Sequence, residues 1–223
     1  MVLSRPAPRA GKRRSEPAVV IAKALVHLLA LAPAAWLAWQ IRSELVLGSG
    51  ALGADPVAAV EHFLGLWAIR FLMVTLAVTP LRQVTGKPVL LRFRRMLGLY
   101  AFFYATLHFA AWAVLDLRLD VSQIATEIAK RPYITVGFAA WLLLVPLAAT
   151  SFQRAMRRLG RRWGQLHRLV YVVAILAVLH FWWLVKSDIR EPALYAAIAA
   201  VLLGWRLWRR LRPVSPRRTA AAG

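Results

Sequence analysis

The chain has 223 residues, of which 60% are hydrophobic and 17% are charged, so it is far more apolar than an average soluble domain. Thirty Lys and Arg against nine Asp and Glu give a formal charge of +21, which in a soluble chain would suggest nucleic-acid binding. The lack of cysteine excludes disulfides, cysteine-ligated iron–sulfur clusters, Cys-type zinc sites and covalent c-type haem attachment. Any metal must therefore be held by His or by oxygen ligands.

Six apolar runs, mostly of about 20 residues, have the length needed to cross a hydrocarbon core roughly 30 Å thick. We predict an all-α integral membrane protein, a bundle of six transmembrane helices over Val19–Gln40, Val57–Thr79, Met96–Leu115, Tyr133–Thr150, Leu166–Val185 and Pro192–Leu211. Residues 1–18 form a basic N-terminus before this 19–211 domain, and 212–223 form a disordered tail. A cleaved signal is the alternative for the first run, although its apolar character continues past a usual signal core.

The basic residues gather on one side of this predicted bundle. When the segments are assigned alternately to two sides, 23 Lys and Arg fall on one side and 6 on the other, and Arg70 alone stays within a span. By the positive-inside rule, both termini and the second and fourth loops are cytoplasmic. Docking of an acidic partner or of anionic lipid by these arginines is the alternative explanation for the surplus.

One familiar motif fails in its context. Residues 48–53 spell GxGxxG, but a dinucleotide-binding loop needs a preceding strand and a following helix N-terminus that receives the pyrophosphate. This stretch is instead predicted to be a short external loop between two membrane spans, so no nicotinamide site is indicated.

Two of the five histidines are matched in depth. His108 lies 12 residues after Met96 and His180 lies 14 after Leu166, on two spans that both run outward. At a rise of about 1.5 Å per residue, both lie at nearly the same height in the outer half of the membrane. Two imidazoles facing each other across a bundle suit bis-His haem ligation. The alternative is that each is a core histidine hydrogen-bonded to a neighbouring helix.

His167 lies 13 residues before His180, which along a straight helix is about 20 Å toward the cytoplasm. A second haem at that depth would want a ligand on the third span, where Arg94 and Arg95 stand instead. Three interpretations stay open: an inner haem with an unusual or absent second ligand and Arg94 at its propionates, a flavin or quinone site, or a plain interfacial histidine.

Arg70 lies near the middle of the second span, where an unpaired guanidinium costs several kcal/mol. We expect it to meet a haem propionate, a backbone carbonyl or a quinone oxygen. A different class of function, a small transporter or channel that uses Arg70 and the intramembrane histidines, competes with the haem hypothesis. No repeat between the two halves is evident to support it. His27 and His62 have no mate at their depths and are taken as structural.

Five stretches resemble the family of haem-binding membrane subunits of the bacterial protein-methionine-sulfoxide reductase system, within the ferric-reductase-like transmembrane superfamily. They cover the second to fifth spans and consist of Ala68–Leu72 through Thr79–Arg82, Arg94–Tyr100 through His108, Pro132–Gly137, Pro146–Ser151, and Leu159–Tyr171 through His180. Their order, together with the spacing of His167 and His180, makes the combined match fairly specific.

The resemblance implies a b-type cytochrome of the inner membrane that passes electrons to a periplasmic molybdopterin enzyme, which repairs oxidised methionines in envelope proteins. It implies that His108 and His180 are the axial ligands of one haem and that His167 is an inner-side cofactor residue. It also implies FMN, for which the sequence holds no binding motif. Because the chain lacks a soluble flavin or nicotinamide domain, electrons would come from quinol or a separate reductase, and the substrate chemistry would belong to the partner subunit.

Overall fold

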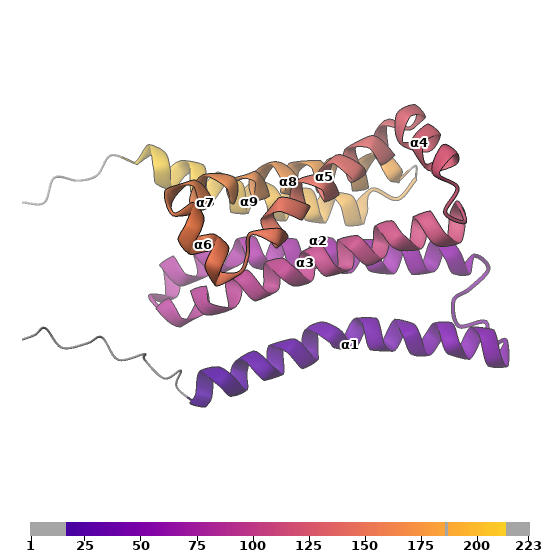
Figure 1. Ribbon diagram of the computed structural model, residues 1–223, viewed down its shortest axis with the longest axis horizontal. Coiled ribbons are helices and arrows are strands. Elements are labelled where there is room, and N and C mark those ends of the chain that lie inside the picture. Colours follow the sequence, from indigo (N-terminus) through magenta and orange to yellow (C-terminus); the bar gives the residue numbers. More distant parts are fainter. Residues whose placement is uncertain (1–16, 186, 213–223) are drawn as a thin grey trace, which may run out of the picture.

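The computed structural model describes residues 17–185 and 187–212, and the regular secondary structure of this part of the chain is all helical (Figure 1). Apart from residues 17, 18 and 212, the basic N-terminus and the tail lie outside the described residues. The elements are α1 Pro17–Leu47, α2 Pro56–Thr85, the 3₁₀ turn η1 Pro88–Leu90, α3 Leu91–Ala111, the π-helical turn η2 Trp112–Asp116, α4 Val121–Lys130, α5 Pro132–Ala149, α6 Gln153–Leu159, α7 Arg161–Leu166, α8 Leu169–Leu184 and α9 Arg190–Leu211.

Five of the six predicted spans are confirmed as segments long and apolar enough to cross a membrane. They are Pro17–Leu47, Pro56–Thr85, Pro88–Asp116, Pro132–Ala149 and Arg161–Leu184. The sixth falls in α9, which has 22 residues but begins with Arg190 and Glu191 and carries three arginines in its last six residues. These charges lower its hydropathy, so the sixth crossing and the cytoplasmic termini stay predictions.

The long helices form two antiparallel hairpins that pack together. One hairpin is α2 with α3 and the other is α5 with α8, while α9 lies along α8 and α2 (Figure 1). Leu72 and Leu76 of α2 and Val173 and Ala174 of α8 are almost completely buried in the core of the bundle. Because both hairpins contribute to this core, side chains of α3 and α8 are brought face to face.

Helix α1 lies to one side of these hairpins and is attached through a tyrosine of α3. Tyr104 is fully buried, its hydroxyl donates to the carbonyl of Ala30 at 2.7 Å, and it accepts from the backbone N–H of Ala34 at 3.2 Å. The hydroxyl is thus inserted between the Ala30 carbonyl and the Ala34 N–H, which are partners in an uninterrupted helix, at the turn that contains Pro33. Ala30 and Ala34, two small residues of the first apolar run, are therefore part of a helix contact.

The acidic residues of the described part lie at one end of the bundle, on the right in Figure 1. They occupy the end of α1, the α1–α2 loop, the start of α2, the segment that contains η2 and α4, the α8–α9 loop and the start of α9. Asp55 and Asp120 cap α2 and α4, where each carboxylate accepts from backbone N–H groups of the first turn. The opposite end carries α6, α7 and most of the arginines.

Candidate cofactor site

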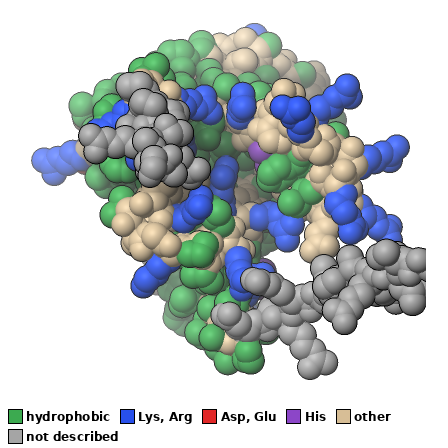
Figure 2. Space-filling model, turned by 90° about the vertical axis from the view of Figure 1, so that its left-hand side faces the viewer, with side chains coloured by type: hydrophobic (Ala, Val, Ile, Leu, Met, Phe, Trp, Pro, Cys, Tyr) green, Lys and Arg blue, Asp and Glu red, His purple; other side chains and the backbone are tan. Residues whose placement is uncertain are grey.

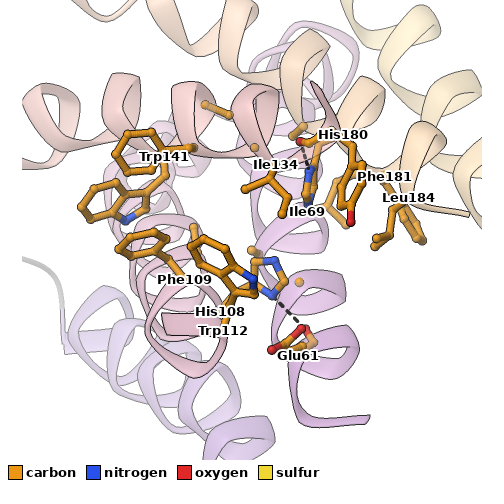
Figure 3. Close-up of a pocket in the computed structure, with 18 of the residues that line it drawn as sticks. Glu61, Ile69, His108, Phe109, Trp112, Ile134, Trp141, His180, Phe181 and Leu184 are labelled. Carbon is orange, nitrogen blue, oxygen red and sulfur yellow. Dashed lines mark hydrogen bonds between the residues drawn. The ribbon is translucent and has the colours of Figure 1, made fainter. Parts of the chain in front are cut away.

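A cavity of about 710 Å³ lies between the two hairpins and is lined by residues of α2, α3, α5 and α8. Its volume is within the range of about 300–1,000 Å³ that is usual for small-molecule and cofactor sites. Phe109, Trp112 and Trp141 form one wall, and Ile134, Phe181 and Leu184 lie on the other (Figure 3). The cavity extends to the acidic end of the bundle, where Asp116 and Arg131 are among its lining residues.

His108 of α3 and His180 of α8 lie opposite each other in this cavity. Their ring centres are 6.1 Å apart and their ring planes are inclined by 69°. The depth match predicted from the sequence is therefore realised as direct proximity. Since a metal–imidazole bond is about 2 Å long, two axial imidazoles on one metal have ring centres about 6 Å apart.

A backbone carbonyl holds the Nδ1 atom of each ring. Nδ1 of His108 lies 2.9 Å from the carbonyl oxygen of Glu61, and Nδ1 of His180 lies 2.7 Å from that of Tyr133. A carbonyl can only accept, so each Nδ1 carries the proton and each Nε2 keeps its lone pair. The two hydrogen bonds leave the rings in opposite directions (Figure 3), which turns the Nε2 sides toward the space between them. This is the orientation of neutral imidazole ligands.

Each ring also rests on a glycine of the helix that holds it. A Cβ added at Gly65 would lie 3.3 Å from Cε1 of His108, and one added at Gly137 would lie 2.6 Å from Nδ1 of His180. The second distance is a collision and the first is a tight contact. The absence of a side chain at both positions therefore lets each imidazole approach the carbonyl four residues earlier in the same helix.

The two hairpins are related by an internal repeat of 72 positions. Glu61, Gly65 and His108 correspond to Tyr133, Gly137 and His180, and the hydrogen bond in each unit joins residues 47 positions apart. The histidines lie in the matching strings ATLHF (105–109) and AVLHF (177–181). No repeat is evident from the sequence alone, because outside these contacts the two hairpins share few identical residues.

His167 lies apart from this cavity, in the turn between α7 and α8. Its ring stacks on Trp163 at 4.0 Å, its Nδ1 lies 3.1 Å from the Trp163 carbonyl, and its buried Nε2 has no hydrogen-bond partner. The repeat pairs His167 with Arg95, whose guanidinium contacts Met156. The straight helix assumed between His167 and His180 is interrupted at this turn.

Arg70 and Arg94, the two arginines predicted for the site, lie in separate places in the bundle. The Nε of Arg70 donates to the hydroxyl of Tyr195 at 3.0 Å, and its guanidinium lies 5.0 Å from the ring centre of Trp67. Its polar contact is thus a tyrosine hydroxyl of α9 instead of the partners expected from the sequence. Arg94 lines a second, smaller cavity at the arginine-rich end.

The histidines taken as structural have contacts of their own. Nδ1 of His27 lies 2.7 Å from the Tyr100 hydroxyl, and Nε2 of His62 lies 3.4 Å from Glu191. His62 also lines the rim of the large cavity.

Sequence reasoning missed the residues that orient the two imidazoles. Gly65 and Gly137 carry no charge, and although Gly137 ends one of the stretches that carry the resemblance, nothing there marks it as the contact of a histidine. The carbonyls of Glu61 and Tyr133 leave no trace in a side-chain pattern. It also missed the wall provided by α5, where Phe138 and Trp141 stack near Phe109. The signal that could have found the glycines is the repeat itself, since each lies 43 positions before its histidine.

The fold and this site together define a multi-pass helical membrane protein with two opposed, backbone-anchored imidazoles over a cofactor-sized cavity. Residues 64–178 match the family described as the ferric reductase like transmembrane component. No solved structure matches the chain.

The most informative relatives are named protein-methionine-sulfoxide reductase heme-binding subunit MsrQ. The protein of Xanthomonas oryzae pv. oryzae (strain MAFF 311018) is 66% identical over 208 residues, which cover 93% of this chain and 94% of the relative. That of Xanthomonas campestris pv. campestris (strain 8004) is 66% identical over 203 residues, or 91% and 92% of the two chains. That of Polaromonas naphthalenivorans (strain CJ2) is 49% identical over 190 residues, or 84% of each chain.

The chain therefore belongs to the MsrQ family, within the ferric-reductase-like transmembrane proteins. It is a multi-pass protein of the bacterial inner membrane.

Proposed function

We propose that this protein binds one haem b between His108 and His180 and relays electrons across the inner membrane. The electrons go to a periplasmic molybdopterin-containing methionine-sulfoxide reductase, which repairs oxidised periplasmic proteins. The observation that carries the proposal is the pair of opposed imidazoles, 6.1 Å between centres, with both Nδ1 atoms bonded to backbone carbonyls. The names of the relatives support both the haem and the methionine-sulfoxide reductase system.

The residues of the cavity fit an iron porphyrin and have separable tasks. The Nε2 atoms of His108 and His180 would hold the haem iron. When bound, a haem supplies a one-electron ferric–ferrous couple. The carbonyls of Glu61 and Tyr133 fix the tautomer of each ring and raise its basicity as a ligand. Phe109, Trp141 and the other apolar side chains exclude water from the porphyrin faces.

The distribution of charge supports a direction for the transfer. Eight of the nine acidic residues, from Glu44 to Glu191, are predicted to lie outside, and 23 of the thirty basic residues inside. The cavity extends to the acidic end, so the haem would lie nearer the outer surface. We propose six spans with cytoplasmic termini, entry of electrons from quinol or a cytoplasmic flavin reductase, and exit to the periplasmic partner.

Two further residues are part of the proposal. His167, with its buried and unpartnered Nε2, is proposed as a contact of a second, inner cofactor. Arg70 is proposed to act on the haem through its charge, since its neighbours Ile69 and Leu72 line the cavity although Arg70 itself does not.

The haem proposal is tested by spectra of the purified protein. We expect a Soret band and a reduced low-spin b-type spectrum in the parent protein, with loss of the low-spin signal in both His108→Ala and His180→Ala. His27→Ala is the matched control, because His27 is an exposed histidine of α1 whose side-chain contact is Tyr100. A parent protein without haem would overturn the proposal and favour the transporter or channel hypothesis. So would a normal spectrum in both cavity variants.

A further inference from the structure

A second cavity, of about 400 Å³, lies at the arginine-rich end of the bundle. Its lining residues come from α2, α3, α8 and α9, and we name it the arginine cavity; they are Thr79, Gln83, Arg94, Tyr171, Arg206, Arg209 and Arg210. Figure 2 looks onto this end and shows Lys and Arg side chains gathered around a hollow.

Two backbone carbonyls hold the guanidinium of Arg206 in the wall of this cavity. One guanidinium nitrogen donates to the carbonyl of Leu202 at 2.6 Å and the other donates to that of Leu76. The Leu76 carbonyl has no helical donor, because residue 80 is a proline and lacks the N–H that would reach it. Arg206 therefore supplies the hydrogen bond that the Leu76 carbonyl lacks in α2. Three of its five N–H groups remain free to bond other acceptors.

Hydrogen bonds also orient Gln83 and Arg94. The indole N–H of Trp205 donates to Oε1 of Gln83 at 2.9 Å, which leaves the amide N–H groups of Gln83 as donors. Nη1 of Arg94 lies 3.5 Å from the hydroxyl of Thr79. The side chains that face the cavity are thus four guanidiniums, an amide and two hydroxyls.

No acidic residue in the described part of the chain lies at this end, so the four formal positive charges have no carboxylate partner there. The C-termini of α2 and α9 contribute only about half a negative charge each. That leaves a surplus of positive charge in a cavity of planar, multiply donating side chains. Such donors are suited to the tetrahedral oxygens of phosphate, each of which accepts several hydrogen bonds.

We propose that the arginine cavity binds a phosphate group. The group belongs either to the headgroup of an anionic phospholipid or to a soluble phosphomonoester. Trp205, Trp208 and the exposed side chains of Val84 and Leu207 lie next to the cavity, as in a site at the membrane interface. This site is separate from the one proposed for haem and does not depend on it.

The test compares two triple variants with the same loss of charge. In Arg94→Gln/Arg209→Gln/Arg210→Gln the cavity loses three guanidiniums. The control, Arg157→Gln/Arg158→Gln/Arg161→Gln, removes three exposed arginines of α6 and α7 that do not line the cavity. A milder variant, Arg209→Gln/Arg210→Gln, changes only exposed residues at the end of α9, and unfolding temperatures check that all three proteins fold.

Two probes separate the sources of the phosphate. Native mass spectrometry counts phosphatidylglycerol retained from mixed phosphatidylcholine nanodiscs, and equilibrium dialysis measures binding of glycerol 3-phosphate, a phosphomonoester without a flavin ring, in nanodiscs of phosphatidylcholine alone. We expect one probe to bind the parent and the control within about twofold of each other. We expect the cavity triple variant to bind it roughly tenfold more weakly or worse, with the milder variant between. The probe that behaves in this way identifies the source. Failure of both probes to bind the parent, or equal binding to the cavity and control variants, would overturn the proposal.

Discussion

Gly137 lies so close to His180 that a Cβ added at the glycine would be 2.6 Å from Nδ1 of the imidazole. The same relationship at Gly65 is looser, since a Cβ there would be 3.3 Å from Cε1 of His108. Because each histidine also bonds the carbonyl four residues before its glycine, ring and helix backbone are fitted to one another in both halves of the repeat.

This difference predicts a graded effect of two equivalent substitutions. In Gly137→Ala the methyl group must push the His180 ring away from the Tyr133 carbonyl, and we expect haem retention to weaken roughly tenfold. Gly65→Ala should weaken haem retention less. Gly98→Ala is the control, because its Cβ would make an ordinary 3.5 Å contact with Thr75. Haem per chain is measured by the pyridine haemochrome method. Equal haem content in all three variants would show that the glycines do not position the ligands.

The sequence was sufficient to predict the helices and the meeting of the two histidines. Hydropathy and helical rise give the depth of a residue in a membrane, so His108 and His180 could be matched before any contact was known. The same reasoning could not predict which face of its helix each histidine occupies. It could not predict the turn at His167 either, where α7 ends and α8 has not begun.

Contacts made by backbone atoms could not be predicted from the sequence. The carbonyls of Glu61 and Tyr133 accept hydrogen bonds regardless of their own side chains, so residue types at 61 and 133 differ while the geometry repeats. The tyrosine partner of Arg70 was missed for a different reason. Tyr195 is distant in sequence and lies in α9, where the resemblance to the family is mostly one of hydropathy.

Tyr104→Phe should loosen α1 from the rest of the bundle. The substitution removes the hydroxyl that bonds both the Ala30 carbonyl and the Ala34 N–H, and the net loss of a hydrogen bond costs about 0.5–1.5 kcal/mol. We expect a lower unfolding temperature with an unchanged haem spectrum. Tyr100→Phe is the graded comparison: it removes the other tyrosine hydroxyl that contacts α1, at the exposed His27, and should lower the unfolding temperature less. An unfolding temperature equal to that of the parent would mean that this hydroxyl does not attach α1.

Arg70→Leu should lower the reduction potential of the haem on the order of tens of millivolts, because a nearby positive charge favours the reduced state. Tyr195→Phe keeps the charge but removes the hydrogen-bond partner of Arg70, so it should shift the potential less. Spectroelectrochemical titration measures both potentials. Equal shifts in the two variants would assign Arg70 a structural role in joining α2 to α9.

Electrons should leave from the acidic end of the bundle. In sealed right-side-out vesicles, the periplasmic partner added outside is expected to oxidise prereduced haem. The rate should fall when Asp116, Asp120, Asp188 and Glu191 are replaced together by their amides, with the greatest loss at low ionic strength. Replacement of four arginines of α6 and α7 by glutamine is the control. Oxidation only by partners on the opposite face would contradict the predicted orientation.

The most direct test of the account removes each ligand and supplies it again. His108→Gly and His180→Gly should each convert the low-spin haem spectrum to a high-spin or haem-deficient one, because the iron loses one of two axial nitrogens. Free imidazole added to either variant should restore the low-spin spectrum, since the cavity left by the side chain lies beside the same iron. A low-spin spectrum that persists in either variant without imidazole would contradict the claim that Nε2 of His108 and Nε2 of His180 share one haem.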